Sequence, residues 1–190
     1  MSDQAKTVEI RWHGRGGQGA VTSAELVAQA AILEDKYAQA FPSFSPERRG
    51  APVMAFNRVN SEKPIRTRAE VDQPDVVIVL DSGLLSIVNP ASGLKETGII
   101  IVNTKKTSDE IRKELGIKQR VATVDATKIA LETLGIPIVN TTMVGALVKT
   151  TDVIKLESME APLQKRFARL AERNIQAMKK AFEETSIGEH

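Results

Sequence analysis

Apolar runs and amphipathic stretches alternate along this chain. Three unbroken apolar runs bounded by polar residues have the composition of strands that are buried on both faces of a parallel sheet. Each run is followed by a stretch in which apolar residues recur at helical spacing. The predicted strands are Asp75–Asp81, Gly98–Asn103 and Arg120–Asp125, and the helices are Ser82–Val88, Ser108–Leu115 and Ala126–Leu134. This alternation predicts an α/β fold of three layers, α/β/α, around a largely parallel (mixed) sheet.

The same patterns predict the remaining elements on either side of these units. No internal repeat and no linker-like stretch divides the chain, so we expect a single domain over residues 1–190. The additional predicted strands are Thr7–His13, Tyr37–Phe41 and Val53–Val59, with Ile65–Arg68 as the return arm of a hairpin. The additional predicted helices are Ala20 to about Glu34, Thr141–Val148, and a long final helix from Pro162 to about Glu184.

A glycine-rich loop joins the first strand to the first helix. Gly14, Gly16, Gly17 and Gly19 fall within six residues and form a Rossmann-like G-x-G-x-x-G pattern. Glycines at the exit of a strand allow an anion to approach the backbone, where it meets the free N–H groups and the dipole of the next helix. The loop therefore predicts a cradle for phosphate groups.

A second unusual loop runs from Phe41 to Pro52 and contains three prolines, two phenylalanines and the adjacent Arg48 and Arg49. The prolines exclude both a regular helix and a central strand. Loops stiffened in this way carry binding residues in many proteins. The alternative is a simple turn whose phenylalanines cap the core and whose arginines are solvated.

Polar residues end three of the predicted strands, at Asp81, Asn103 and Asp125. Ligands of open α/β sheets bind at the carboxyl ends of the strands, so these residues are candidates for a pocket. Alternatively, each one caps the following helix, and capping is the favoured role for Asp125, which directly precedes a helix. His13 ends the first strand, and we expect it to hydrogen-bond the glycine loop.

The composition excludes several kinds of chemistry. The 190 residues include no cysteine and only two histidines, His13 and His190. Disulfides, cysteine nucleophiles, cysteine-ligated metal clusters and multi-histidine metal sites are therefore excluded. The formal net charge of +2 gives no reason to expect binding to nucleic acid or to a membrane surface. With no apolar span and no secretory signal, we expect a cytoplasmic protein.

A stand-alone dehydrogenase is poorly supported. An NAD site also requires an acidic residue at the end of the second strand, whereas Tyr37–Phe41 is followed by Pro42 and Ser43. The chain has no P-loop motif and no serine or cysteine nucleophile beside a histidine base. A nucleotide-type cradle without catalytic residues suits a binding subunit of a larger enzyme.

Four blocks of sequence resemble the gamma subunit of the 2-oxoacid:ferredoxin oxidoreductases, especially the pyruvate type, pyruvate synthase. The resemblance covers nearly the whole chain in the same order. The blocks are Trp12–Gly19, Phe41–Ser43 with Glu47–Pro52, Pro74–Asp81 and Asn140–Leu147.

The resemblance implies a subunit of a multi-subunit enzyme of anaerobic metabolism. Such an enzyme oxidatively decarboxylates a 2-oxoacid with coenzyme A, giving acyl-CoA, CO2 and reduced ferredoxin. The implied partners are alpha, beta and delta (ferredoxin-like) subunits and ferredoxin. Thiamine diphosphate, Mg and iron–sulfur clusters would belong to those subunits, so this chain alone would hold no cofactor and would be inactive.

The resemblance also implies a site for CoA, with no catalytic or metal-binding residue on this chain. Gly14, Arg15, Gly16, Gly17, Gln18 and Gly19 would lie near the phosphates or the pantetheine arm, and Ser43, Glu47, Arg48 and Arg49 would line the same cleft or a subunit interface. The chain has Phe44-Ser45-Pro46 where family members often carry a Tyr-Gly pair. Two alternatives remain: an independent NAD(P)-dependent oxidoreductase, and a scaffold whose glycine loop only packs the first helix against the sheet.

Overall fold

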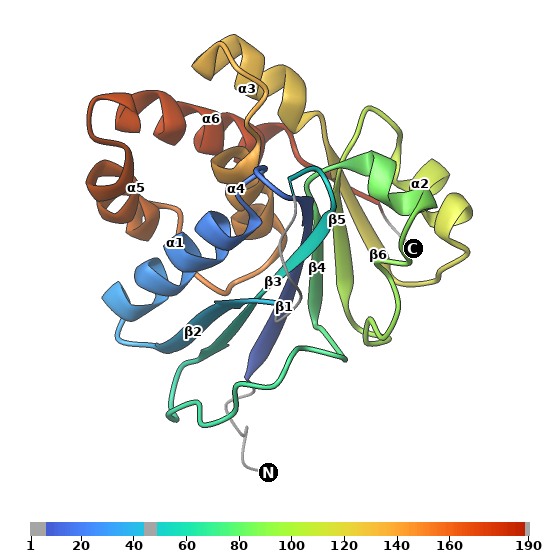
Figure 1. The fold of residues 1–190 in the computed structure, drawn as a ribbon, viewed down its shortest axis with the longest axis horizontal. Coiled ribbons are helices and arrows are strands. Elements are labelled where there is room, and N and C mark those ends of the chain that lie inside the picture. Colours follow the sequence, from blue (N-terminus) through green and yellow to red (C-terminus); the bar gives the residue numbers. More distant parts are fainter. Residues whose placement is uncertain (1–6, 44–48, 189–190) are drawn as a thin grey trace.

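The computed structural model describes residues 7–43 and 49–188, which form a seven-stranded sheet with helices on both faces (Figure 1). The strands are β1 (Val8–Arg15), β2 (Tyr37–Pro42), β3 (Pro52–Asn60), β4 (Val76–Val79), β5 (Ile99–Asn103), β6 (Arg120–Val124) and β7 (Ser186–Ile187). The α-helices are α1 (Ala20–Leu33), α2 (Ser108–Leu115), α3 (Ala126–Leu134), α4 (Asn140–Thr150), α5 (Glu160–Phe167) and α6 (Ala171–Glu184). The 3₁₀ helices are η1 (Ser82–Ser86), η2 (Glu157–Met159) and η3 (Ala168–Leu170).

The sheet is mixed, with strand order β2-β3-β1-β4-β5-β6-β7. Strands β1, β4, β5 and β6 run parallel to their neighbours within this group. Strand β3 pairs antiparallel with β1, and the edge strands β2 and β7 pair antiparallel with β3 and β6. The predicted α/β class with a largely parallel, mixed sheet is confirmed.

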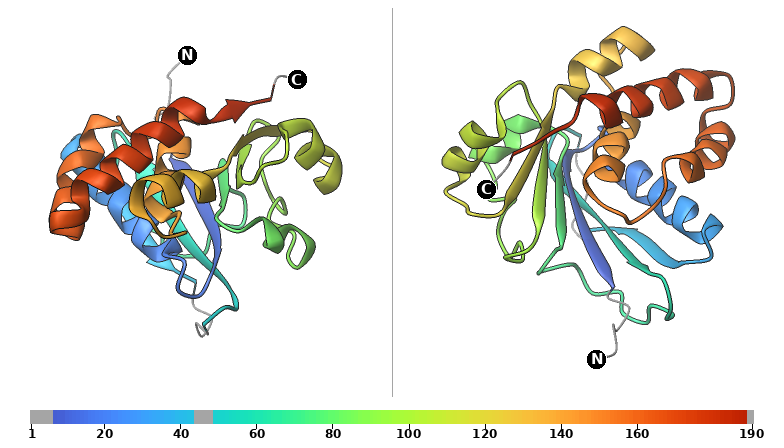
Figure 2. Two further views of the ribbon diagram at one scale, coloured as in Figure 1. Left: turned by 90° about the horizontal axis from the view of Figure 1, so that it is seen from above. Right: turned by 180° about the vertical axis from the view of Figure 1, so that it is seen from behind.

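Alternate residues of the central strands enter two separate cores. On β4, Ile78 belongs to the larger core, whereas Val77 and Val79 belong to the smaller one. Helices α1, α3, α4, α5 and α6 lie over the first face, and α2 with η1 lies over the second (Figures 1 and 2). Because helices cover both faces, the central strands need the continuous apolar sequences that identified them.

The boundaries of the short helices follow from their capping residues. The side chain of Thr107 accepts a hydrogen bond from the Glu110 N–H, and the Glu110 side chain accepts one from the Thr107 N–H, which forms a capping box at the start of α2. Asp125 accepts from the Lys128 N–H at 3.0 Å and begins α3. The predicted capping role of Asp125 is therefore confirmed.

Three sequence predictions differ from the structure. The final helix is two helices, since Ala168 has φ 44° and ψ −114° and turns the chain between α5 and α6. This break lets α5 pack against α1 while α6 packs along α4. Residues 65–68 form no strand, because β3 already has β1 and β2 on its two edges. Residues 82–88 form only the short η1.

The first helix packs close to the sheet through small side chains. Ala20, Ala24, Ala28 and Ala31 are all buried on α1. Their size lets the helix axis approach β2 and β3, which it contacts along its length. This close packing fixes the N-terminus of α1 directly at the end of β1. None of the helices in the described part of the chain has the length and apolarity that a membrane span requires.

Candidate functional site

The glycine loop makes a tight turn between β1 and α1. Gly17 has φ 92° and Gly19 has φ 84°, values in the left-handed region that favours glycine. The Gln18 N–H donates to the Arg15 carbonyl at 2.9 Å and closes the turn. A Cβ atom at Gly19 would lie 2.7 Å from Nδ2 of Asn140, whereas a Cβ at Gly17 would have no atom within 4 Å. Gly17 is therefore at the open crown of the loop.

Three polar side chains hold this loop in place. Asp81, at the end of β4, accepts hydrogen bonds from Nε of Arg15 at 2.8 Å and from Nε2 of Gln18 at 3.0 Å. The Gln18 Oε1 in turn accepts from the Arg15 N–H at 2.7 Å. Burial opposes ionisation of Asp81, but the hydrogen bonds from Gln18, Arg15 and the Gly83 N–H outweigh it and hold the pKa of this carboxyl below its ordinary value. Arg15 and Gln18 thus position the loop.

The glycine loop also contacts the end of the proline-rich loop. The Gly16 N–H donates to the Ala51 carbonyl at 2.9 Å, and the Gly50 N–H donates to the Gly16 carbonyl at 3.2 Å. Nη1 of Arg15 donates to the Gly50 carbonyl at 3.3 Å. The structure therefore brings together two segments that are distant in sequence and that both contain predicted site residues.

The remaining predicted site residues have different positions. Arg49 forms an isolated parallel bridge with Gly16, and it is exposed. The Ser43 N–H donates to the Met54 carbonyl at 2.9 Å, which extends the β2–β3 pairing beyond Pro42. Glu47 and Arg48 lie outside the described residues. Gly14 is tightly enclosed, because a Cβ there would lie 3.1 Å from Cδ1 of Leu80.

The crown of the loop has the properties of an anion site. Gly19 is the N-cap of α1 and provides no side-chain acceptor, and the first turn of α1 contains no acidic residue. Within residues 7–43 and 49–188, no atom accepts a hydrogen bond from the N–H of Gly17 or Gly19. The helix dipole adds positive potential at the same point. The physical requirements of the predicted phosphate cradle are therefore present.

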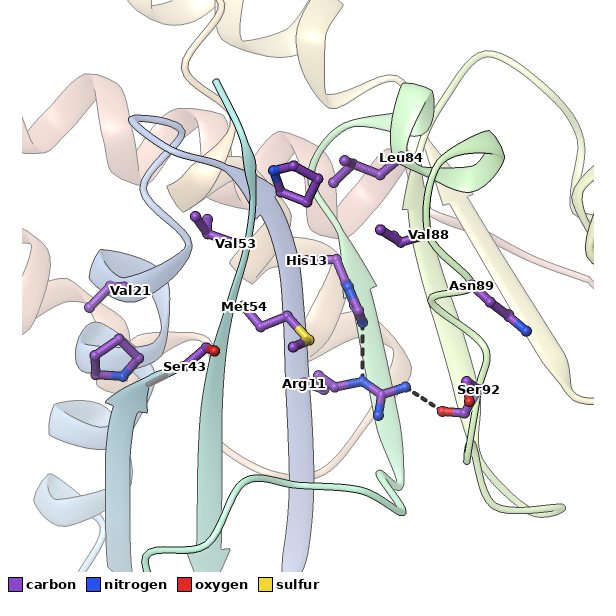
Figure 3. Close-up of a pocket in the computed structure, with 12 residues that line it drawn as sticks. Arg11, His13, Val21, Ser43, Val53, Met54, Leu84, Val88, Asn89 and Ser92 are labelled. Atoms are coloured by element: carbon purple, nitrogen blue, oxygen red, sulfur yellow. Dashed lines mark hydrogen bonds between the residues drawn. The ribbon is translucent and has the colours of Figure 1, made fainter. Parts of the chain in front are cut away.

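A cavity of about 310 Å³ opens beside this loop (Figure 3). Val21 in the first turn of α1 and Ser43 after β2 line one side, and His13, Leu84 and Val88 line the other. Its size is at the lower end of the range of small-molecule sites.

Arg11 and His13 contribute the buried polar groups of this cavity. Arg11 is 7% exposed, and its guanidinium donates to the carbonyls of Val71, Pro90 and Ser92. Its Nε donates to Nε2 of His13 at 3.1 Å. Burial first, and the charge of Arg11 second, lower the pKa of His13 to about 3, so the imidazole is neutral at physiological pH. The predicted hydrogen bond from His13 to the glycine loop is wrong, since its partner is Arg11.

Sequence reasoning did not find Arg11, because it lies within a strand. The available signal was an arginine placed between the apolar Ile10 and Trp12 in the first predicted strand. A charged residue in a strand that is buried on both faces needs several acceptors. Here those acceptors are carbonyls from two loops that are about 60 to 80 residues away in sequence.

A wider crevice lies at the carboxyl ends of the parallel strands. Asp81, Asn103 and Asp125 all line it, as the strand-end argument predicted, together with Lys105 and Lys106. Nδ2 of Asn103 donates to the Leu80 carbonyl at 2.9 Å. The two proposed roles of these strand-end residues are therefore compatible, because Asp81 and Asp125 cap helices and also border the crevice.

The arrangement of the strands differs from a dinucleotide-binding fold. In that fold the strand after the first helix lies beside the first strand and carries the acidic residue for the ribose. Here β3 separates β2 from β1, and β2 ends at Pro42. The geometry therefore offers no support for an NAD site.

Comparisons with known proteins identify the family. The family model described as pyruvate ferredoxin/flavodoxin oxidoreductase matches residues 9–184. The chain belongs to this family. The gamma subunit common to the pyruvate and ketoisovalerate oxidoreductases of Pyrococcus abyssi is 54% identical over 184 residues, which cover 96% of this chain and 99% of the relative.

Two further members of the pyruvate ferredoxin/flavodoxin oxidoreductase family support this assignment. Pyruvate synthase subunit PorC of Methanothermobacter marburgensis is 49% identical over 93% of this chain and 96% of its own. The crystal structure of pyruvate oxidoreductase subunit PORC from Thermotoga maritima has a TM-score of 0.88 at 42% identity, covering 97% of this chain and 99% of that one. The resemblance to the gamma subunit is confirmed, and the relatives are subunits of an oxidoreductase complex.

Proposed function

We propose that this chain is the gamma subunit of a multi-subunit pyruvate (2-oxoacid):ferredoxin oxidoreductase and that it contributes CoA binding and assembly. The complex would convert a 2-oxoacid and CoA to acyl-CoA and CO2 and pass the electrons to ferredoxin. The names of the relatives support the subunit type. The open crown at Gly17, beside the uncapped N-terminus of α1, supports the role in binding an anionic ligand such as CoA.

The partners in this proposal are alpha, beta and delta subunits and ferredoxin. The chain has no cysteine to ligate an iron–sulfur cluster, so the clusters would reside on the partner subunits, as would thiamine diphosphate and Mg. A cytoplasmic location is part of the same proposal. The isolated chain would bind ligand without catalysing the reaction.

One observation favours a second candidate function, that of a scaffold without a ligand. Asp81, Arg15 and Gln18 hold the glycine loop through hydrogen bonds that need no bound molecule. In that case the glycines would serve only to bring α1 close to the sheet, as Gly19 does against Asn140. The two functions predict different effects of a substitution at Gly17, where an added Cβ would meet no atom of the described residues within 4 Å.

A substitution at Gly17 therefore tests the proposal. Gly17→Ala adds a methyl group in the path of an approaching phosphate while meeting no atom of the described residues within 4 Å. Gly135→Ala is a matched control, since Gly135 also has a positive φ and open space around its Cβ position but ends α3. Both variants should lose about 1 kcal/mol of stability from the left-handed conformation alone.

The measurement is the steady-state rate of 2-oxoacid oxidation as a function of CoA concentration, in the enzyme reassembled with its partner subunits. We expect Gly17→Ala to raise the KM for CoA about tenfold, equivalent to the ~1.4 kcal/mol lost with one good phosphate contact. Gly135→Ala should leave it unchanged. Equal CoA dependence in both variants would favour the scaffold.

A further inference from the structure

His13 has a fixed protonation pattern that the role of the glycine loop does not explain. His13 is only 6% exposed, and its Nε2 lies 3.1 Å from Nε of Arg11. An arginine Nε–H can only donate, so Nε2 of His13 must be the acceptor. The neutral ring therefore carries its proton on Nδ1.

The Nδ1–H group has no partner in the described part of the chain, although His13 lines the cavity of about 310 Å³. Nδ1 of His13 is not one of the fully buried side-chain atoms that lack a partner, so it remains accessible from the cavity, where a ligand carbonyl can take the place of water as its acceptor. The donor comes from a rigid central strand, which fixes its position before any ligand arrives.

Arg11 has no N–H group available to bind a ligand in the cavity. Its Nε–H is used by His13, and its two terminal nitrogens donate to backbone carbonyls of residues 71–72 and of residues 90 and 92. The guanidinium thus has no donor left for a carboxylate or phosphate. The cavity therefore does not suit a further anionic group in addition to the phosphates at the glycine loop.

The other walls of the cavity are mostly apolar. Val53, Met54, Leu84 and Val88 line it, and among residues 7–43 and 49–188 no aspartate or glutamate belongs to the lining. An uncharged chain with one well-placed carbonyl oxygen fits this combination, because the apolar walls would penalise additional charges.

Two residues that line the cavity adjoin the proposed phosphate cradle along the chain. Val21, which lines the cavity, is the second residue of α1, whose N-terminus follows Gly19. Pro52, also in the lining, directly follows Ala51, whose carbonyl accepts the Gly16 N–H. A ligand with phosphates at the loop could therefore extend an uncharged arm into the cavity.

We propose that the cavity binds the amide-containing pantetheine arm of CoA, with one amide carbonyl accepting the Nδ1–H of His13. The proposal rests on the proposed function, because CoA is its source of an uncharged amide chain attached to phosphates. It assigns a binding role to a histidine that would otherwise only pack in the core.

Nuclear magnetic resonance of the full chain tests the contact directly. The chain has two histidines, so His190→Gln leaves His13 as the only imidazole in a sample labelled with ¹⁵N-histidine. Pantetheine should shift the Nδ1 and Hδ1 signals of His13. Adenosine 3′,5′-bisphosphate, which resembles the other end of CoA, should leave these signals in place.

A pair of substitutions separates a ligand contact from a structural role. His13→Gln can keep an acceptor for Arg11 near the position of Nε2 and removes the Nδ1–H donor, whereas His13→Asn keeps a donor near Nδ1 and removes the acceptor. In the reassembled enzyme we expect His13→Gln to raise the KM for CoA roughly fivefold to tenfold with little change in kcat, as for one lost hydrogen bond. His13→Asn should lower the melting temperature more and the affinity for CoA less.

The outcomes distinguish the two proposals. If CoA binds to the chain but the His13 signals do not move, the arm lies elsewhere and the cavity proposal is overturned while the CoA role stands. If pantetheine moves the His13 signals but Gly17→Ala leaves the KM for CoA unchanged, the cavity contact stands and the phosphate cradle fails. If His13→Asn raises the KM as much as His13→Gln, the effect is structural and the contact is rejected.

Discussion

Nε1 of Trp12 donates a 2.8 Å hydrogen bond to Oδ1 of Asn57, and both residues are fully buried. Nδ2 of Asn57 donates to the carbonyl of Ala24 on α1 at 2.8 Å. One amide therefore joins β1, β3 and α1 close to the glycine loop. Buried polar networks of this kind are strongly stabilising only when every member has a partner.

Asn57→Leu should destabilise the chain strongly. The substitution leaves the Trp12 indole N–H buried without an acceptor, which should lower the free energy of unfolding by about 2–4 kcal/mol. Urea unfolding followed by tryptophan fluorescence measures the change, since Trp12 is the only tryptophan. Gln176→Leu is the control, because Gln176 is exposed on α6 and its replacement should change stability by less than about 0.5 kcal/mol. Equal stability of the two variants would contradict a structural role for the amide.

Ala168→Gly should stabilise the chain. Ala168 is exposed and has φ 44° and ψ −114°, a region of backbone conformation that is accessible essentially only to glycine. Relief of this strain should outweigh the higher entropy of glycine in the unfolded chain and raise the free energy of unfolding by about 1 kcal/mol. Thermal unfolding checks the direction. Ala161→Gly, at an exposed position in α5, should instead lower stability by roughly 0.5–1 kcal/mol.

The sequence predicted the central elements well because their patterns are local. The bounds of α2 and α3 follow from a threonine or aspartate cap at one end and a left-handed glycine at the other. The break at Ala168 could not be read from the sequence, since alanine is a good helix former and only tertiary packing forces its conformation. The two-residue strand β7 was missed for a similar reason, as its pairing with β6 depends on where α6 ends.

The candidate site was predicted in part. Local composition predicts the glycine loop and the loop from Phe41 to Pro52 as binding segments, and backbone hydrogen bonds join Gly16 to Gly50 and Ala51. The hydrogen bonds of Arg15 and Gln18 to Asp81 could not be predicted, because they depend on how β1 and β4 are placed side by side. Arg11 and His13 are two residues apart on β1 and so share a face of the sheet, but the carbonyls that hold the Arg11 guanidinium come from distant loops and could not be predicted.

Gly145→Ala should destabilise the chain by separating α4 from α6. A Cβ atom at Gly145 would lie 2.0 Å from the carbonyl oxygen of Met178, which belongs to the backbone of α6 and cannot move by a side-chain rotation. Helix α6 would have to shift, at a cost of about 3 kcal/mol. Gly116→Ala is the control, since its Cβ would meet nothing within 4 Å and its cost should be about 1 kcal/mol. A crystal structure of a stable Gly145→Ala variant with α6 unmoved would contradict this account.

The neutral state of His13 should make stability depend on pH. Burial, with the Arg11 charge as the smaller cause, lowers the pKa of His13 to about 3 in the folded chain, whereas the unfolded chain has an ordinary histidine pKa of about 6.5. Below about pH 6.5 the unfolded state binds a proton that the folded state does not bind. The free energy of unfolding should therefore fall as the pH is lowered, by up to about 1.4 kcal/mol per pH unit until the folded pKa is reached.

His13→Gln should flatten this dependence between about pH 6.5 and pH 4.5, because glutamine does not titrate. Urea unfolding at several pH values measures the slope in both chains. The depressed pKa of Asp81 acts in a different range: its stabilising effect is present above the unfolded pKa of about 3.9 and is lost as the pH falls through the folded value. Asp81→Asn should therefore change the profile only in strong acid. If His13→Gln kept the parental slope between pH 4.5 and 6.5, another group would have to carry the proton uptake, and the assignment of a neutral, Nδ1-protonated His13 would fail with it.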